Sequence, residues 1–340
     1  MCPLLSACRA RYSAAWVSPT NPRILPYGEA AIAEAARVIA AGGCVAVPTE
    51  TVYGLAADAT DSRAVAGIYE AKGRPSFNPL IVHVPDLAAA ERIAEFDDVA
   101  RDLARRFWPG PLTLVLPVRS DAGIASLVTA GLETIAIRVP RHRAMQALLA
   151  ASGKPLAAPS ANASGGISPT RAAHVAASLA GRIPLVIDDG ATEAGLESTI
   201  VRGREILRPG PLTFEDLFSG EGRSPGEESG SPDNAALRPS PEHGKVVAPG
   251  QLDSHYAPSK PVRLNATEAS EGEWLIGFGD VSGDDSLSIA GDLTEAAANL
   301  FDALHRADAA PANAIAVASI PETGIGIAIN DRLRRAAHPR

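Results

Sequence analysis

Hydroxyl and cationic side chains gather in one stretch of the chain, residues 45–83. Thr49 and Thr51 follow a short apolar run, and Lys72 and Arg74 come one helix-like segment later. No acidic residue lies between the two cations. They favour a phosphate or a carboxylate as ligand, because ammonium and guanidinium groups both bind these anions. The stretch predicts a site for a small anionic molecule.

The elements that must position these groups read as strand, turn, helix and strand. Residues 45–47 form a buried strand, residues 49–54 a hydroxyl-rich turn, and the helix-like segment then begins near Asp61. Asn78 and His83 lie around the second strand. Polar groups collected at the ends of buried elements are what a small-molecule site in an α/β domain requires.

Later segments supply similar groups. Arg138 lies inside an apolar strand, where an unpaired charge would be costly, so it needs either a protein acid or a ligand carboxylate. The small residues of 159–170 precede a helix and would let backbone approach a phosphate at its N-terminus. Asp188 and Asp189 end another strand; a solvated turn is favoured there over Mg²⁺ binding.

Composition bounds the class of protein. The 340 residues are 46% hydrophobic, and the formal net charge of -8 argues against a broad basic face for nucleic acid. The three cysteines form no CxxC pair, which fits a reducing compartment and predicts a cytoplasmic protein. No run is long and apolar enough to span a membrane, so no membrane partner is expected.

Several long motifs carry a family resemblance. PTETVYGL, KGRPSFNPLIVH, WPGPLTLVL, PSANASGGISPT and HYAP, in this order, resemble the YrdC-like family of threonylcarbamoyl-AMP synthases. The resemblance covers nearly the whole chain after residue 25. It implies that L-threonine, bicarbonate and ATP, with Mg²⁺, are condensed to threonylcarbamoyl-AMP and pyrophosphate. It also implies a downstream tRNA threonylcarbamoyl transferase that uses the product, with tRNA itself as a further candidate partner.

The same resemblance implies site roles at matching positions. L-threonine would contact Thr51, His83, Arg138, Ala158 and Ser198. ATP would contact Arg74, Asn78, Thr134, Ser160, Ser168, Arg208 and Tyr256. Lys72 and Arg74 are predicted to be catalytic, taking phosphate charge together with Arg208 and Mg²⁺. No protein metal ligand is predicted, and His83 is the one candidate general base.

The expected architecture is α/β. It combines a YrdC-like twisted mixed sheet with flanking helices and a small C-terminal Rossmann-like α/β domain. The expected division is a disordered extension at 1–24, a catalytic domain at 25–215, a linker crossing the active site at 216–258, and a companion domain at 259–340.

Three alternatives stay open on the sequence. A carbamoyl-transfer enzyme of the hydrogenase-maturation type contains a similar domain, but such chains carry Cys-rich zinc modules that this chain lacks. A non-catalytic RNA-binding module conflicts with the net charge of -8, because RNA-binding surfaces are basic. A family member that binds ATP without making product is excluded only by an assay.

Overall fold

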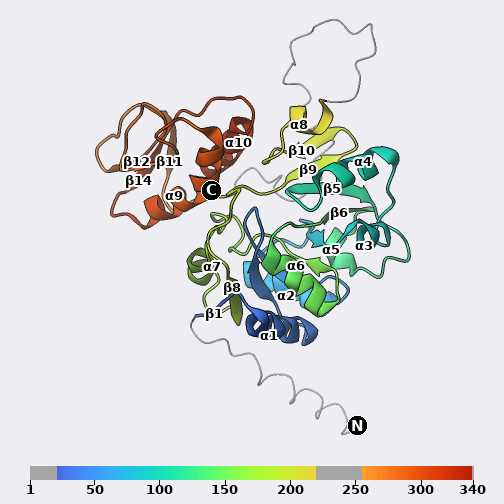
Figure 1. The fold of residues 1–340 in the computed structure, drawn as a ribbon. Helices are drawn as coiled ribbons and strands as arrows, with labels where there is room; N and C mark the ends of the chain where they lie inside the picture. Colours follow the sequence, from blue (N-terminus) through green and yellow to red (C-terminus); the bar gives the residue numbers. More distant parts are fainter. Residues whose placement is uncertain (1–20, 220–254, 339–340) are drawn as a thin grey trace, which may run out of the picture.

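The computed structural model describes residues 21–219 and 255–338, which form two α/β units (Figure 1). The larger unit contains the strands β1 (Arg23–Pro26), β2 (Val45–Pro48), β3 (Tyr53–Asp58), β4 (Ile81–His83), β5 (Leu112–Pro117), β6 (Thr134–Arg138), β7 (Leu156–Ala157), β8 (Leu185–Asp188), β9 (Thr199–Arg202) and β10 (Glu205–Arg208). They form a mixed ten-stranded sheet in the order β1-β8-β2-β3-β7-β4-β6-β5-β9-β10.

Helices flank this sheet. They are α1 (Glu29–Ala40), α2 (Ser62–Lys72), α3 (Leu87–Glu91), α4 (Asp98–Phe107), α5 (Ser126–Thr129), α6 (Arg143–Ser152), α7 (Ala172–Ser178) and α8 (Phe214–Phe218). The strands β2 and β3 are buried almost throughout, as expected for a sheet covered on both faces.

The smaller unit is built on a four-stranded sheet in which every pair is parallel, in the order β11-β14-β12-β13. Its elements are β11 (Val262–Ala266), β12 (Glu273–Gly277), β13 (Asp285–Ser286), α9 (Leu293–Ala309), β14 (Ala314–Ala318) and α10 (Gly326–Ala336). The mixed sheet and this parallel companion sheet confirm the expected fold class.

The first long motif folds as a hairpin, which corrects one expectation. The turn predicted over 49–54 ends at Val52, because Tyr53 and Gly54 already belong to β3, which pairs antiparallel with β2. The strand YGLAAD was missed because Gly and Ala have low strand propensity and the run does not alternate. The hairpin turn is what presents Thr49 and Thr51.

Helix α2 delivers the cations. Asp61 caps it by accepting hydrogen bonds from the backbone of Arg63 and Ala64, as its sequence predicts. Gly73 ends the helix in the left-handed conformation with φ of 59°. Lys72 therefore lies in the last turn, directly before the loop that carries Arg74.

The N-terminal boundary is earlier than predicted. Strand β1 begins at Arg23 and pairs in parallel with β8, so the extension expected at 1–24 overlaps ordered structure. This strand has only four residues, too few to show a periodic hydrophobic pattern. It is recognised only by its pairing with β8, which lies far away in the sequence. The rest of that extension, residues 1–20, and most of the expected linker, residues 220–254, lie outside the described residues.

The two units share one apolar cluster. Val52, Ile167 and Leu196 of the larger unit pack with the buried faces of α9 and α10, which lie on the side of the smaller unit toward the larger one (Figure 1). Gly195 makes this possible, because a Cβ there would lie 2.4 Å from the Ala297 carbonyl oxygen. Within the described ranges, no helix is long and apolar enough to cross a membrane.

Candidate active site

A small cavity of about 50 Å³ lies among the predicted site residues. Those that line it are Thr51, Arg74, His83, Arg138, Ala158, Ser160, Ser198, Arg208 and Tyr256. The central strands explain this convergence: β4 pairs with both β6 and β7, which places His83 opposite Arg138 and near Leu156. Parallel pairing of β5 with β9 brings Ser198 to the same region.

Arg138 has a protein partner that the sequence analysis did not identify. Its Nη2 lies 2.7 Å from Glu50 Oε1, though off the line of a hydrogen bond, and both side chains are buried. Its Nη1 donates to Thr51 Oγ1 at 2.9 Å, and its Nε donates to the Gly110 carbonyl at 3.2 Å. The sequence left open whether a protein acid or a ligand carboxylate pairs with Arg138. The structure shows that Glu50 is such a protein acid.

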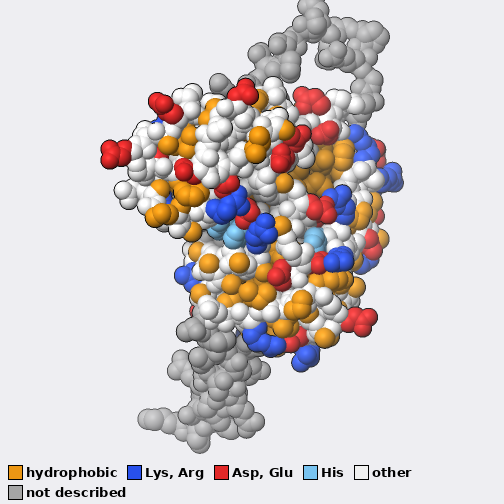
Figure 2. Space-filling view, turned by 60° about the vertical axis from the view of Figure 1, so that its left-hand side comes forward, with side chains coloured by type: hydrophobic (Ala, Val, Ile, Leu, Met, Phe, Trp, Pro, Cys, Tyr) orange, Lys and Arg blue, Asp and Glu red, His pale blue; other side chains and the backbone are white. Residues whose placement is uncertain are grey.

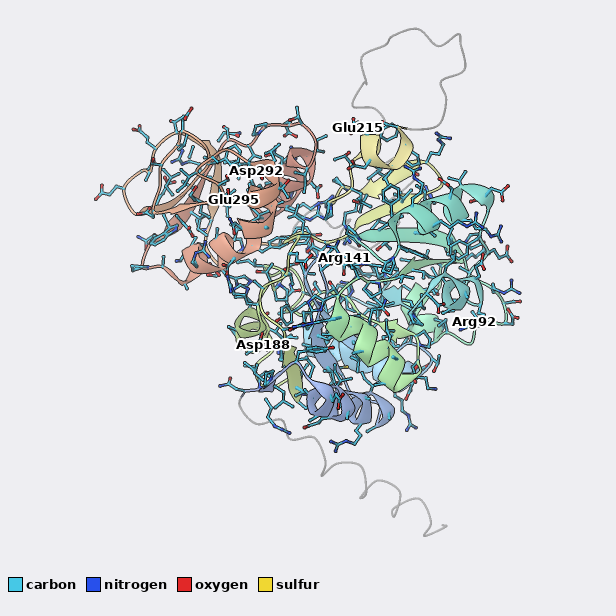
Figure 3. All side chains as sticks on the ribbon, in the orientation of Figure 1. Arg92, Arg141, Asp188, Glu215, Asp292 and Glu295 are labelled. Atoms are coloured by element: carbon cyan, nitrogen blue, oxygen red, sulfur yellow. The ribbon has the colours of Figure 1, made fainter. Side chains whose placement is uncertain are left out.

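Glu50 remains charged in this setting. Burial alone would raise its pKa, but the charge of Arg138 at 2.7 Å, together with hydrogen bonds from backbone donors, lowers the pKa below its usual value. One of those donors is the backbone N–H of Arg141, labelled in Figure 3, which lies 3.0 Å from Glu50 Oε2. The pair thus brings a guanidinium to the cavity without net charge.

Lys72 lies next to the cavity and supports its wall. Its Nζ donates to the carbonyl oxygens of Ser160 and Asn162 at 2.5 and 2.6 Å. Burial, followed by repulsion from Arg74, lowers the pKa of Lys72 well below its ordinary value. Its position ties the α2 terminus to the predicted phosphate loop.

The two arginines on this side are also held by carbonyl groups. Arg74 Nη2 donates to Pro79 at 2.9 Å, and burial lowers the pKa of Arg74 to about 10. Arg208 donates from Nη2 to the carbonyl of Ser198 at 2.9 Å and to Ser198 Oγ at 3.1 Å. No carboxylate of residues 21–219 or 255–338 forms an ion pair with either arginine, so both keep their charge available to an anion.

Asn78 is fully buried, and neither atom of its side-chain amide has a partner among the described residues. A buried amide rarely stays unpaired in a protein that has no ligand for it. Its backbone carbonyl accepts from Arg74 Nε at 3.3 Å, which places this residue beside Arg74 in the chain's folded arrangement. Asn78 does not line the cavity, so its predicted contact with ATP stays a prediction.

Ser168 and Thr134 lie outside the cavity wall. Ser168 is fully buried and donates its hydroxyl to Glu197 Oε1. Thr134 begins β6, so its Cα lies about 13 Å along the strand from that of Arg138. A nucleotide is long enough to reach both positions, and the predicted ATP contacts of these two residues stay predictions.

His255 and Tyr256 enter the cavity from the start of the second described range. Tyr256 is buried with φ of 63°, a left-handed conformation that costs a non-glycine residue free energy. Its ring lies 4.1 Å from the His255 ring and 5.6 Å from Phe301, while its hydroxyl has no hydrogen-bond partner among the described residues. These contacts hold the ring inside the site.

Three residues of the site and its surroundings escaped the sequence analysis as functional groups: Glu50, Glu197 and Arg332. His255 was considered as a titrating or hydrogen-bonding group, but as a lone histidine it was expected to be structural or solvated. Glu50 and Glu197 were detectable, because each is an acid inside an otherwise uncharged buried motif. Arg332 gave no signal, since the run DRLRR reads as a solvated helix face. The Asp188 and Asp189 turn carries protein contacts, with Asp188, labelled in Figure 3, accepting from Tyr53 and Asp189 pairing with Arg143.

The fold and the site define a class: an α/β domain that binds a small anionic substrate in a buried cationic and hydroxyl-lined cavity. A family model described as Telomere recombination (Sua5, YciO and YrdC proteins) matches residues 37–210, and one described as Threonylcarbamoyl-AMP synthase, C-terminal domain, matches residues 215–338. The chain belongs to the threonylcarbamoyl-AMP synthase family.

Similar proteins cover both units. Threonylcarbamoyl-AMP synthase of Bacillus subtilis is 41% identical over 333 residues, covering 91% of this chain and 93% of the relative. The Pyrococcus abyssi synthase is 41% identical over 330 residues, with 89% and 93% covered. The crystal structure of P. abyssi Sua5 complexed with L-threonine superposes with a TM-score of 0.80 at 38% identity, covering 93% of this chain and 97% of that one.

Proposed function

We propose that this chain is an L-threonylcarbamoyladenylate synthase. It condenses L-threonine, bicarbonate or carbon dioxide, and ATP to threonylcarbamoyl-AMP and pyrophosphate. The observation that carries the proposal is the single cavity that joins the hydroxyl-rich surroundings of Arg138 to the unneutralised cations Arg74 and Arg208. The binding of L-threonine by the similar P. abyssi protein supports the assignment of one half of this cavity.

On the threonine side, Arg138 offers its guanidinium to the carboxylate, and Thr51 and Ser198 offer hydroxyls. Backbone at Ala158 completes this half. Burial, followed by the charge of Arg138, lowers the pKa of His83 to about 3, so its imidazole is neutral at neutral pH. A group with so low a pKa is a weak base, and we assign His83 to hydrogen bonding with threonine rather than to proton removal.

On the ATP side, the reaction needs alignment and charge stabilisation. The threonine amine loses a proton and bonds to carbon dioxide, and an oxygen of the resulting carbamate attacks the α-phosphorus. The bond from that phosphorus to the bridging oxygen breaks, and pyrophosphate leaves. Lys72, Arg74 and Arg208 stabilise the negative charge that develops. Asn78, Ser160 and Ser168, with Thr134 and Tyr256, hold the nucleotide in line.

Mg²⁺ belongs to this proposal as a companion of ATP. Within the residues that the structure describes, no group of three or more His, Cys, Asp or Glu side chains could hold a metal. This fits an ion that arrives on phosphate oxygens and keeps several waters, as Mg²⁺ commonly does. When bound, it would withdraw charge from the phosphates beside the three cations.

The cavity must enlarge for this reaction. Its volume of about 50 Å³ is far below the roughly 300–1,000 Å³ of sites for nucleotide-sized ligands. Tyr256 and His255 belong to this lining, and we propose that their side chains are displaced when ATP enters. This movement is consistent with the role predicted for a linker that crosses the site.

The product implies the partners. Threonylcarbamoyl-AMP is an activated acyl donor, and a downstream tRNA threonylcarbamoyl transferase would consume it in the cytoplasm. Tight association with tRNA is less well supported by charge. The face shown in Figure 2 mixes acidic and basic side chains and carries no broad basic surface.

The decisive experiment measures pyrophosphate release from purified protein with ATP, Mg²⁺ and bicarbonate, with and without L-threonine. Strict dependence on both threonine and bicarbonate is expected. ATP bound without turnover would favour a non-catalytic ATP-binding protein. ATP turnover that ignores threonine would require another acceptor.

A paired substitution then tests the division of the cavity. Lys72→Ala should mainly lower kcat, because its charge acts on the phosphates, whereas Arg138→Ala should mainly raise KM for threonine. Steady-state kinetics with each substrate varied separately gives both constants. Equal small effects of both changes on rate and stability would contradict these assignments.

A further inference from the structure

The smaller unit contributes a side chain to the wall behind the cavity. Arg332 lies in α10 and is completely buried. Its Nε donates to Glu197 Oε2 at 2.8 Å, and its Nη2 donates to the Pro209 carbonyl at 3.0 Å. Its Nη1 donates to Asp331 Oδ2 at 2.7 Å, and Asp331 pairs in turn with Arg335 at 3.1 Å, so Arg332 and Arg335 together balance Asp331 and Glu197. Arg332 and Glu197 come from different units, so the pair forms only when the two are docked.

Glu197 is the acid that faces the ATP side of the cavity. It lines the cavity, and its Oε1 accepts the hydroxyl of Ser168. Burial would raise its pKa, but the charge of Arg332, followed by that of Arg208, lowers the pKa, so the group is an anion. A carboxylate thus stands among residues proposed to bind a triphosphate.

This arrangement contains an electrostatic conflict that Arg332 relieves. An anionic wall repels a polyanionic ligand, and the repulsion is strong where water is excluded. Arg332, which is not among the residues that line the cavity, places a positive charge against the glutamate. The same guanidinium lies 5.1 Å from the centre of the Tyr256 ring, so it also contacts the residue that fills the site.

Other contacts also hold the two units together, so the Arg332–Glu197 pair is not needed for docking alone. Arg171 forms two hydrogen bonds with Asp302, at 3.1 and 3.2 Å, and His305 contacts the Ser168 carbonyl at 3.2 Å. Apolar packing is continuous across the junction. A buried ion pair adds little stability to such an interface compared with apolar residues of the same shape.

We propose that Arg332 is a positioning residue of the synthase reaction. By neutralising Glu197 and fixing its carboxylate against Ser168, it allows the ATP side of the cavity to accept the triphosphate. The companion domain is therefore part of the catalytic apparatus, and the inference rests on the function proposed above.

The test is a charge-suppression experiment on the full chain. Arg332→Met keeps much of the side-chain volume and leaves Glu197 unbalanced, so KM and Kd for ATP should rise at least about tenfold, as for other broken buried charge pairs. KM for threonine should change much less. Adding Glu197→Gln removes the uncompensated charge, and the double variant should regain most of the lost ATP affinity.

Two further variants separate positioning from folding. Arg332→Lys keeps the charge and should bind ATP more tightly than Arg332→Met. Arg334→Met is the matched control, because Arg334 lies on the same helix but is exposed and pairs with exposed Glu322; it should leave ATP affinity unchanged. Thermal melting of every variant shows whether it is folded.

The proposal is overturned if the double variant binds ATP no better than Arg332→Met, or if ATP and threonine constants worsen together with loss of folded protein. If Arg332→Met does not fold, the comparison of Arg332→Lys and the double variant with wild type decides by the same criterion. ATP affinity is measured by calorimetry as well as turnover. A wild-type protein that binds ATP but releases no pyrophosphate would therefore refute the proposed function, while the Arg332 comparison would still be decided by binding.

Discussion

At the scale of single residues, this site is made of buried charges whose partners decide what they can do. Arg138 is paired with Glu50, and Glu197 with Arg332, while among the described residues Arg74 and Arg208 form hydrogen bonds to carbonyl and hydroxyl oxygens and no ion pair. Isolated charges cost far more to bury than paired ones. The unneutralised cations are therefore the groups with the most to gain from an anionic ligand.

The Arg138–Glu50 pair can be dissected by double substitution. Glu50→Gln or Arg138→Met alone should lower the free energy of unfolding by about 3–5 kcal/mol, because each leaves an uncompensated buried charge. The double variant should recover most of that loss, measured by urea denaturation, yet keep a raised KM for threonine. A double variant with wild-type threonine kinetics would show that the pair is structural only.

The lowered pKa of buried His83 should make the free energy of unfolding depend on pH. Its folded pKa of about 3 lies below the unfolded value near 6.5, so the unfolded chain binds more protons between these pH values. Stability from this group is complete above pH 6.5 and should fall by about 1.4 kcal/mol per unit as pH drops from 6 to 4. Denaturation midpoints of wild type and His83→Gln across this range isolate the contribution.

The internal control for His83 is the region above pH 7, where neither state of the wild-type histidine titrates. There the stability difference between the two proteins should be constant. Parallel curves from pH 7 down to pH 4 would mean that the pKa of His83 is the same in the folded and unfolded protein, and would contradict the lowered pKa.

At the scale of elements, short turns between strands place the site groups. The β2–β3 turn carries Thr49 and Thr51, whose hydroxyls lie 2.8 Å apart, and Thr49 is further bonded to the Val52 carbonyl. The segment before β9 carries Ser198, which also bonds to Thr113 at 2.7 Å. Such crowding leaves little room for side chains where these segments cross.

Gly210 tests this crowding. A Cβ there would lie 2.4 Å from the Thr199 amide nitrogen and 2.7 Å from the Glu197 carbonyl oxygen. Gly210→Ala should therefore displace the Ser198 segment, lower stability by about 1–3 kcal/mol, and raise KM for both substrates. Gly28→Ala is the control, since its Cβ meets nothing within 4 Å and its φ of 168° suits any residue. Equal melting temperatures of the two variants would contradict the crowding argument.

At the scale of the whole molecule, the two units are coupled through their shared apolar cluster. Interfaces between domains that are large and apolar suppress independent motion. The site therefore depends on docking as well as on the larger unit alone.

This coupling predicts one cooperative unfolding transition for both units. Calorimetry of the full chain should give equal calorimetric and van't Hoff enthalpies. Phe301→Ala, at a fully buried position of the shared cluster, should destabilise the protein by about 3–5 kcal/mol. Ile289→Ala should change little, since that side chain is 83% exposed. Two separated transitions in the wild type would show that the units unfold independently.

Much of the site followed from local sequence. Thr51, Arg74 and Arg138 were conspicuous as hydroxyls and cations inside apolar motifs, and Arg208 was implied by the family resemblance. The structure brings all four to one cavity. Helix α2 followed from its cap and its apolar spacing. These features depend on residues close together in the chain, which periodicity and composition can report.

The tertiary structure alone decided the pairing of charges and the role of docking. Glu50 meets Arg138 across 88 positions of sequence, and Glu197 meets Arg332 across 135. Strand β3 was recognisable only from its pairing with β2 and β7. Contacts of this kind leave no periodic trace, because they arise from how the sheet order and the docking of α10 fold distant segments together. Which charges are balanced, and so which remain for a ligand, is a property of the folded chain.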